Sequence, residues 1–264
     1  MRLYCEVVRT TSRRMATYRG ATVAGVFTNT VFGFILSYVL LAVFRERTTI
    51  GGFDAVDAVT FTFVVQGMFV ITGVSAADPE MAERIRSGEV AMDLCRPYDY
   101  QGWWAAVAYG RASFFLWARG VPPFLAGALF LEVRLPDEAW QWPAYAASLV
   151  LAVGIAFAWG FLLQLSAFWL VDVRGPNQIG WLLAQFLAGA FVPLFLFPEA
   201  LERVARVLPF ASMIQLPVEV FLGKHAGSDL ALIYAGQVTW LVALVALGRW
   251  VLARAVRKVV IHGG

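Results

Sequence analysis

The chain has 264 residues, of which 60% are hydrophobic and only 15% are charged. Soluble domains typically hold about 45–50% apolar and about 25% charged residues, so this composition excludes an ordinary soluble globular protein. The formal net charge of +3 is spread over the ends of apolar segments and forms no single basic patch, which argues against a nucleic-acid partner.

Six apolar segments are long enough to be membrane-spanning helices, since about 20 apolar residues cross about 30 Å of hydrocarbon. A basic amphipathic helix over residues 2–19 precedes them and is expected to lie in the membrane interface. The sequence therefore predicts an all-α, polytopic membrane protein with one domain over residues 1–264. The expected spans are approximately 21–44, 56–77, 112–133, 143–171, 179–197 and 230–251.

A charged segment, residues 78–97, separates the second and third spans. Asp78 can cap a helix that begins at Pro79, and Gly88 can end that helix in a left-handed turn. A second short amphipathic helix follows and stops at Pro97. This pattern fits both an interfacial helix with a solvated charged face and a docking element for another protein.

A second irregular segment, residues 198–224, precedes the last span. Pro209 and Pro217 cut it into pieces too short to cross a membrane, so a re-entrant helical hairpin is expected. About 13 basic residues fall on the side of the two termini and about 6 on the other, which predicts cytoplasmic termini by the positive-inside rule. Residues 78–97 then lie in the cytoplasm and the hairpin lies outside.

The sequence offers little that could carry out catalysis. Its two histidines, His225 and His262, have no catalytic partner on their own segments, and no G-x-x-x-x-G-K-S/T phosphate-binding loop occurs. Cys5 and Cys95 lie far apart, without the spacing of a metal site or a disulfide framework. We expect no catalytic residue, no metal and no cofactor bound by this chain, which leaves transport as the function.

Polar side chains inside the spans have two interpretations. Uncharged amides most often form hydrogen bonds between helices, but they can also line a transport pathway. The candidates for a pathway are Asn29, Gln66, Gln164 and Gln185. Arg119 is expected to extend its guanidinium to the inner headgroups. The small residues Gly180, Ala184 and Ala188 recur every four positions and indicate close helix packing, either within one subunit or between two.

Two stretches resemble a known family. The stretch "RIRSGEVAMDLCRPYDYQ" is similar to the segment after the second span of ABC-2-type permeases, the membrane subunits of bacterial ABC exporters, with the approximate pattern I-x-x-G-x-(I/V/L)-x-x-x-L-x-(R/K)-P. "LFPEALERVARVLPFASMIQLPVEVFLGK" is similar to the F-P-x-x-(L/I), L-P-F and P-x-x-x-(F/Y)-L-G pieces of the same family. Cys95 departs from the aliphatic residue expected before Arg96. The matching residues are Ile85, Gly88, Val90, Leu94, Arg96 and Pro97 in the first stretch, and Phe197, Pro198, Leu201, Leu208, Pro209, Phe210, Pro217, Phe221, Leu222 and Gly223 in the second.

The resemblance implies the permease subunit of an ATP-driven exporter in the bacterial inner membrane. Two copies of a separate ABC ATPase would carry ATP and Mg, and a second permease chain would complete a homodimer or heterodimer among membrane lipids. Residues 78–97 would be the coupling segment, and the outer hairpin would close the pathway at Pro198, Pro209, Phe210, Pro217 and Gly223. The implied coupling residues are Met81, Glu83, Arg84, Ile85, Arg86, Gly88, Glu89, Asp93, Leu94, Arg96 and Pro97.

Substrate and mechanism are expectations of the same kind. The largely apolar, aromatic spans suit a hydrophobic or amphipathic substrate, which would move outward by alternating access. The alternative is an ATP-independent channel or secondary transporter, although the sequence shows no internal repeat of the kind common in secondary transporters.

Overall fold

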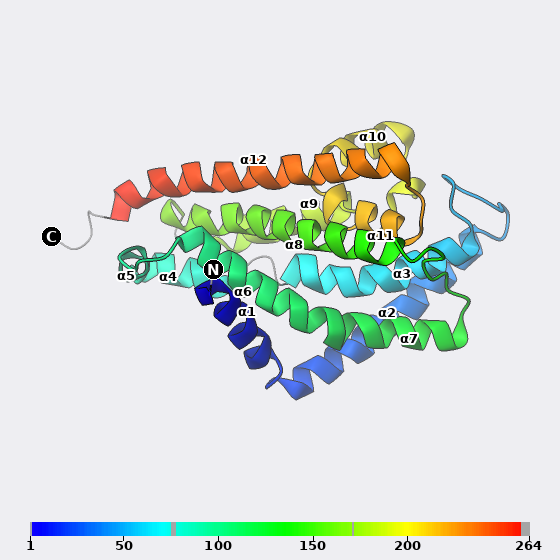
Figure 1. Ribbon diagram of the computed structural model, residues 1–264, viewed down its shortest axis with the longest axis horizontal. Coiled ribbons are helices and arrows are strands. Elements are labelled where there is room, and N and C mark those ends of the chain that lie inside the picture. The colour runs from blue at the N-terminus through cyan, green and yellow to red at the C-terminus, as the bar shows by residue number, and fades with distance from the viewer. Residues whose placement is uncertain (1, 75–77, 171, 260–264) are drawn as a thin grey trace.

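The computed structural model describes residues 2–74, 78–170 and 172–259, and within these ranges the chain is a bundle of helices (Figure 1). The described residues form no β-strand, and one isolated bridge joins Ile50 to Phe53. The predicted all-α class is confirmed. Five helices are long and apolar enough to cross a membrane: Arg19–Val43, Ala55–Gly73, Tyr100–Phe130, Gln141–Phe168 and Gly227–Arg257.

The N-terminal helix α1 (Arg2–Met15) is amphipathic, as its sequence predicts, and packs against α6 (Tyr100–Phe115). Its Val7 is buried, and Gly110 of α6 allows a close approach of the two backbones. A Cβ at Gly110 would lie 2.6 Å from the carbonyl oxygen of Val8, so no larger side chain fits without a shift. The first span, α2 (Arg19–Val43), follows α1 after a short turn.

The second span, α3 (Ala55–Phe69), is the most enclosed helix of the bundle, and 83% of its most apolar window is buried. It begins with a capping box: the Asp54 side chain accepts a hydrogen bond from the Asp57 amide, and the Asp57 side chain accepts one from the Asp54 amide. Its last turn widens into the π-helical η1 (Val70–Val74). The capping box therefore stabilises the first turn of α3.

The third span differs from the expectation. One continuous helix runs from α6 through the π-helical turn η2 (Leu116–Gly120) into α7 (Val121–Phe130), so this span begins at Tyr100 and not near residue 112. The Pro122–Pro123 pair lies in the first turn of α7, just after η2. Proline lacks the N–H of a regular helical turn, and the wider π turn accommodates that loss without ending the helix.

The fourth span, α8 (Gln141–Leu165), is the central helix against which most others pack, and it continues into η3 (Ser166–Phe168). The segment expected as the fifth span, 179–197, instead forms α9 (Arg174–Leu187) and then an irregular stretch. Its 14 residues span about 21 Å, less than the hydrocarbon thickness of about 30 Å. Gly189, with a φ of +83°, and Pro193 end the helix early.

The small residues of α9, which were expected to pack either within one subunit or between two, pack within this chain. A Cβ at Gly180 would lie 2.7 Å from the Leu163 side chain of α8, and Ala184 and Ala188 are buried. This face therefore packs inside the chain. The opposite face of α9 is exposed and apolar, with Ile179, Leu182, Leu183 and Phe186.

The remaining helices complete the two ends of the bundle. The charged helices α4 (Pro79–Arg86) and α5 (Val90–Leu94) lie at the end where α12 (Gly227–Val259) finishes (Figure 1). The short helices α10 (Glu199–Val207) and α11 (Gln215–Phe221) lie toward the opposite end, with the connections 44–54 and 131–140. The two segments singled out by sequence thus occupy opposite halves of the molecule.

Candidate functional site

The charged segment folds as its sequence predicts at both turns. The Asp78 side chain accepts a hydrogen bond from the Glu80 amide at 3.0 Å, and Pro79 occupies the first helical position of α4. Gly88 has a φ of +80° and joins α4 to α5. Two short helices therefore meet at a glycine corner, in a compact projection that we call the coupling segment, residues 78–97.

The apolar face of the coupling segment is buried in the chain's own core. Met81 and Ile85 are 2% and 7% exposed, and with Val90 they join a cluster that includes Phe161 and Leu165 of α8. Met81 and Ile85 were expected to face an ATPase; that contact stays a prediction, and within this chain both side chains pack inward. Amphipathic periodicity identifies an apolar face but not the surface that covers it; here the covering surface is α8.

A bidentate ion pair joins the two helices of the segment. The Arg84 guanidinium donates to both carboxylate oxygens of Asp93, from Nε at 2.6 Å and from Nη2 at 2.8 Å, and its Nη1 lies 3.0 Å from Glu89. Asp93 is 4% exposed. The hydrogen bonds that Arg84 donates to Asp93 raise the pKa of Arg84. Arg84 and Asp93 therefore hold α4 on α5 and contribute little to an outer contact surface.

The coupling segment is attached to the membrane helices at each end. Arg111 of α6 forms an ion pair with Asp78 at 2.9 Å, where the segment begins. At the other end, Asp99 accepts a hydrogen bond from the Gly102 amide at 2.6 Å and thereby caps α6. The Tyr4 hydroxyl of α1 accepts a hydrogen bond from the Asp99 amide at 3.2 Å. These contacts connect the segment to α6 and α1.

The exposed face of the coupling segment carries the remaining predicted residues. Glu83, Arg86 and Glu89 are exposed, and Leu94 is half-buried. Met92 of α5, which was not among the predicted residues, is 62% exposed. The helical spacing of Glu89, Met92 and Arg96, which places them on one face of this short helix, is the sequence signal that indicates it. The other exposed positions of the predicted set are Gly88, Arg96 and Pro97.

The four predicted pathway amides do not converge on one site. Asn29 donates to the carbonyl oxygens of Gln66, at 3.1 Å, and of Arg119, at 3.3 Å. Gln164 accepts from Asn177 at 3.1 Å. Gln185 is 1% exposed and donates to the Phe69 carbonyl at 3.5 Å. Three of the four thus make contacts between elements of the bundle.

Arg119, expected to extend to the inner headgroups, is half-buried, and its guanidinium packs against α2. Its Nη2 is 3.4 Å from the Asn29 Oδ1, and a Cβ at Gly25 would lie 2.3 Å from the guanidinium. The arginine therefore fills space that Gly25 leaves free on α2. No spacing rule links residues 25 and 119, so only the fold brings them together.

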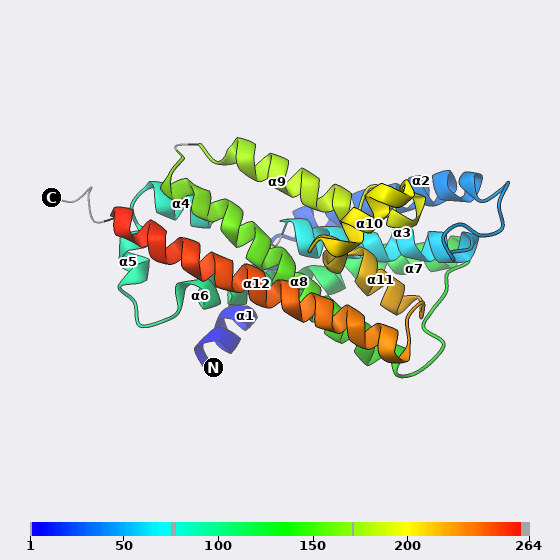
Figure 2. The same cartoon turned by 90° about the horizontal axis from the view of Figure 1, so that it is seen from above.

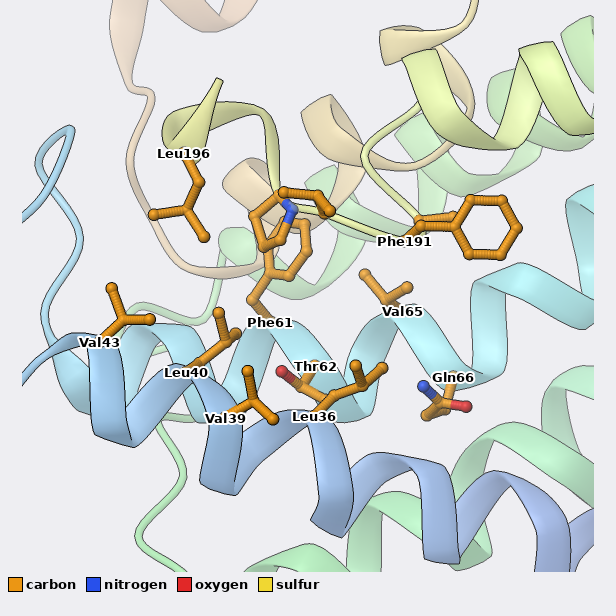
Figure 3. Close-up of a pocket in the computed structure, with 13 residues that line it drawn as sticks. Leu36, Val39, Leu40, Val43, Phe61, Thr62, Val65, Gln66, Phe191 and Leu196 are labelled. Carbon is orange, nitrogen blue, oxygen red and sulfur yellow. The ribbon is translucent and has the colours of Figure 1, made fainter. Parts of the chain in front are cut away.

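Gln66 lines an apolar groove (Figure 3). The groove has a volume of about 170 Å³ and lies between α2, α3 and the stretch after α9. Val39, Val43 and Leu196 form part of its apolar wall, with Thr62 beside Gln66. A hydrophobic group with one polar atom fits this lining.

At the opposite end of the bundle, the hairpin residues surround a buried carboxylate. Glu219 of α11 is 2% exposed and accepts hydrogen bonds from Arg206 at 2.8 and 3.1 Å and from Gln215 at 2.8 Å. His225 Nε2 lies 2.8 Å from Glu219, and its Nδ1 contacts Asp229 of α12. The hydrogen bond to Glu219 is the main cause of the raised pKa of His225, and Asp229 adds to it. We call this group the Glu219 cluster.

A second buried carboxylate, Asp57, lies at the same end of the bundle but far away in sequence. Asp57, 1% exposed, forms ion pairs with Arg134 and with Lys224, and Arg134 also binds Asp54 at 2.9 Å. This Asp57 cluster connects the start of α3, the connection between α7 and α8, and the loop before α12. Neither cluster was predicted from the sequence. The Asp57 cluster joins distant segments, whereas the Glu219 cluster lies within residues 206–229 and depends on how the short helices fold back on each other.

The predicted hairpin residues have distinct local roles. Pro198 caps the start of α10, Phe210 packs edge-on against Trp159 with ring centroids 5.1 Å apart, and Gly223 has a φ of +68° after α11. Pro209 lies between the helices, as expected. Pro217 does not cut the segment: it lies in the first turn of α11, where its missing N–H costs nothing.

A comparison with known families decides the classification. A family model described as ABC-2 family transporter protein matches residues 27–263, which include both the coupling segment and the hairpin. The chain belongs to the ABC-2 transporter family. Comparisons with curated proteins and with solved structures found no match.

Membership of the ABC-2 transporter family agrees with the helical, membrane-spanning architecture of the chain. An ABC-2 permease is the membrane subunit of a transporter and is not catalytic by itself, and its general partner is an ABC ATPase. The five apolar helices make it a multi-pass membrane protein. Among the described residues, no group of three or more His, Cys, Asp or Glu side chains is placed to hold a metal ion.

Proposed function

We propose that the chain is the permease subunit of an ATP-driven exporter and that its coupling segment docks on a separate ABC ATPase. One observation carries this proposal. The segment presents an exposed charged face around Met92, while its other face is fixed to α8, and Arg111 ties its start to α6. Such a projection is built to receive force and pass it to the spans.

The proposed cycle uses two ATPase copies, which bind ATP and Mg and close on each other. Their closure moves the coupling segments of two permease chains, which form a homodimer or heterodimer. ATP can drive this change only if it binds one conformation more tightly than the other. The Arg84–Asp93 pair and the buried face keep the segment from yielding locally, so that the membrane helices move with it.

The proposed pathway carries a hydrophobic or amphipathic substrate outward. The apolar groove of Figure 3, with Gln66 and Thr62 as its polar atoms, supports this substrate class. The exposed apolar faces of α2 and α9 flank the groove and are the proposed contact with the second permease chain. Asn29, Gln164 and Gln185 act in this scheme by holding helices together.

The proposed topology places both termini and the coupling segment in the cytoplasm of a bacterium, with the permease in the inner membrane. The chain after α8 returns outward through α9 and residues 188–197 as a sixth crossing. Helices α10 and α11 form a re-entrant hairpin that closes the outer end. The burial of the Glu219 carboxylate and its three side-chain partners supports a hairpin enclosed by protein.

Co-expression with a candidate ABC ATPase and a pull-down tests the docking. Met92→Asp places a charge in the centre of the proposed contact and should therefore abolish ATPase retention. Because Met92 is exposed, the substitution leaves the buried core untouched, and a loss of retention reports on docking. Leu135→Asp is the matched control: Leu135 is 52% exposed in an outer connection, and its replacement should leave retention unchanged. Ile85→Asp is a poor test, because Ile85 is buried and its loss disrupts the fold.

Two results would overturn the proposal. A wild-type chain that never retains an ATPase favours the alternative, an ATP-independent channel or secondary transporter. Equal retention by wild type and Met92→Asp, with unchanged ATP turnover, would show that this face is not the docking surface. Transport of an amphipathic dye into inside-out vesicles, with and without ATP, then tests the direction of export.

A further inference from the structure

A second groove lies between α6 and α12, away from the pathway groove of Figure 3. Both helices pack on α8, which lies between them in Figure 1, and the space they leave has a volume of about 500 Å³. Its floor is α8, at Gly154 and Phe157. The groove is therefore a feature of how three spans meet.

The walls of this groove are smooth and apolar. Ala105 of α6 and Ala246 of α12 line it with small side chains, and Leu241 and Val245 continue the α12 wall. Tyr109 also lines it, but its hydroxyl donates to the Val150 carbonyl at 3.0 Å and is satisfied. A long, unbranched hydrocarbon chain matches these walls.

The end nearest the coupling segment is polar. Arg249 closes the groove there, and its side chain is 66% exposed and only 3.9 Å from Asp99, a weak pair. Gln101 is 3% exposed and donates from Nε2 to the Val245 carbonyl at 3.4 Å. Its Oε1 is buried and has no hydrogen-bond partner among the described residues. A cation and an unsatisfied acceptor thus lie together at one end.

The neighbouring surface of α12 indicates that this side faces lipid headgroups. Trp250 is 54% exposed, and the Arg254 guanidinium lies over its ring at 4.2 Å from the centroid. Tryptophan and arginine concentrate where a membrane-spanning helix leaves the hydrocarbon. The polar end of the groove is therefore at headgroup depth and its apolar length lies in the acyl region.

We propose that this groove binds a glycerophospholipid of the leaflet on the coupling-segment side. One acyl chain lies along the Ala105 and Ala246 walls, and the phosphate pairs with Arg249. A hydrogen-bond donor of the headgroup, such as the hydroxyls of phosphatidylglycerol, reaches the half-exposed Asp99 carboxylate, which lines the same end. The site is independent of the transported substrate, since it lies on α6, α8 and α12 and not on the pathway groove.

Photo-crosslinking tests the site. The purified permease is reconstituted in phosphatidylcholine vesicles that contain a small fraction of phosphatidylglycerol with a diazirine on one acyl chain, and adducts are mapped by peptide mass spectrometry. Adducts should concentrate in residues 101–109 and 241–249. Unlabelled phosphatidylglycerol should compete, whereas extra phosphatidylcholine, whose headgroup has no donor, should not.

Variants separate the groove from the rest of the lipid-facing surface. Ala246→Trp fills the groove and should remove these adducts; Ala105→Leu narrows the opposite wall and provides a second test if the first variant folds poorly. Arg249→Gln should lower the adduct yield roughly fivefold, which corresponds to about 1 kcal/mol for one cation at an anionic lipid surface. Leu247→Trp and Arg254→Gln, on the same helix but outside the groove, are the matched controls and should keep the adducts.

Three outcomes would overturn the site. Adducts spread evenly over all lipid-facing helices would mean that the groove is ordinary membrane surface. Adducts that persist in both filled variants would place the lipid elsewhere. Disulfide formation between two copies of an Ala246→Cys variant made without other cysteines would show that a second permease chain covers the groove.

Discussion

Glu219→Gln is the sharpest test of the outer hairpin, because it removes one charge from a buried cluster and keeps the shape of the side chain. The wild-type carboxylate accepts from Arg206, His225 and Gln215 at once. A glutamine has only one acceptor oxygen, and its NH₂ group would face groups that donated hydrogen bonds to the second carboxylate oxygen. The variant therefore leaves Arg206 without its bidentate partner.

The cost can be worked from burial. Removing one partner of a fully buried ion pair costs about 3–5 kcal/mol. Arg206 is 32% exposed and keeps Glu202 at 2.8 Å, so its charge is not stranded. We therefore expect a loss of about 2–3 kcal/mol, below the fully buried range. At about 2–4 °C per kcal/mol for a chain of this size, the thermal midpoint should fall by about 5–10 °C.

The assay is thermal unfolding of the purified permease in one detergent, with Glu199→Gln as the matched control. Glu199 pairs with Arg203 on the same helix, but their side chains are 80% and 73% exposed. An exposed pair of this spacing contributes about 0.3–0.5 kcal/mol, so the control should hardly change. Equal midpoints for the two variants would refute the reasoning, since burial would then not decide the cost.

Three further predictions follow from the same geometry. Asp93→Asn frees Arg84 and should lower ATP turnover of the assembled complex several-fold. The pKa of His225 is raised above 6.5. Its pairing therefore stabilises the fold fully below that pH, and the stabilisation is lost as pH rises through the raised pKa. The thermal midpoint of the wild type should fall between about pH 6 and about pH 9, and by more than the midpoint of His225→Gln. Gly67→Ala should destabilise by about 1–3 kcal/mol, because its Cβ would lie 2.8 Å from the Gly120 backbone.

Each of these predictions has a control and a contrary result. Asp137→Asn, in an exposed outer connection, should leave ATP turnover unchanged, and an equal loss there would contradict the role of the Arg84 pair. A pH dependence that is the same in His225→Gln assigns the titration to another group. Gly236→Ala meets open space in α12 and should stabilise slightly; destabilisation by both alanines would mean that the close helix contact is not the cause.

Local sequence signals predicted the elements that depend on neighbouring residues. The Asp78–Pro79 start and the Gly88 corner of the coupling segment follow from capping and backbone rules that act within a few positions. The long apolar runs likewise located α2 and α8 within a few residues.

The early end of α9 is a local feature that hydropathy alone overlooks: Gly189 and Pro193 end a helix whose sequence remains apolar beyond its last turn. Other features are decided by a distant part of the chain. The covering of Met81 by α8 is one of them, because periodicity identifies an apolar face but not its partner. The Asp57 cluster joins residues 167 positions apart, and such a pairing is visible only in the folded chain.

One short loop has a consequence for how the outer end opens. Lys224 belongs to the Asp57 cluster and His225, the next residue, to the Glu219 cluster. A single peptide unit thus fastens α12 to two separate anchors, one on α3 and one on α11. A displacement of Lys224 and His225 along the axis of α12 would strain both anchors together, so the two carboxylate clusters are mechanically connected through this loop.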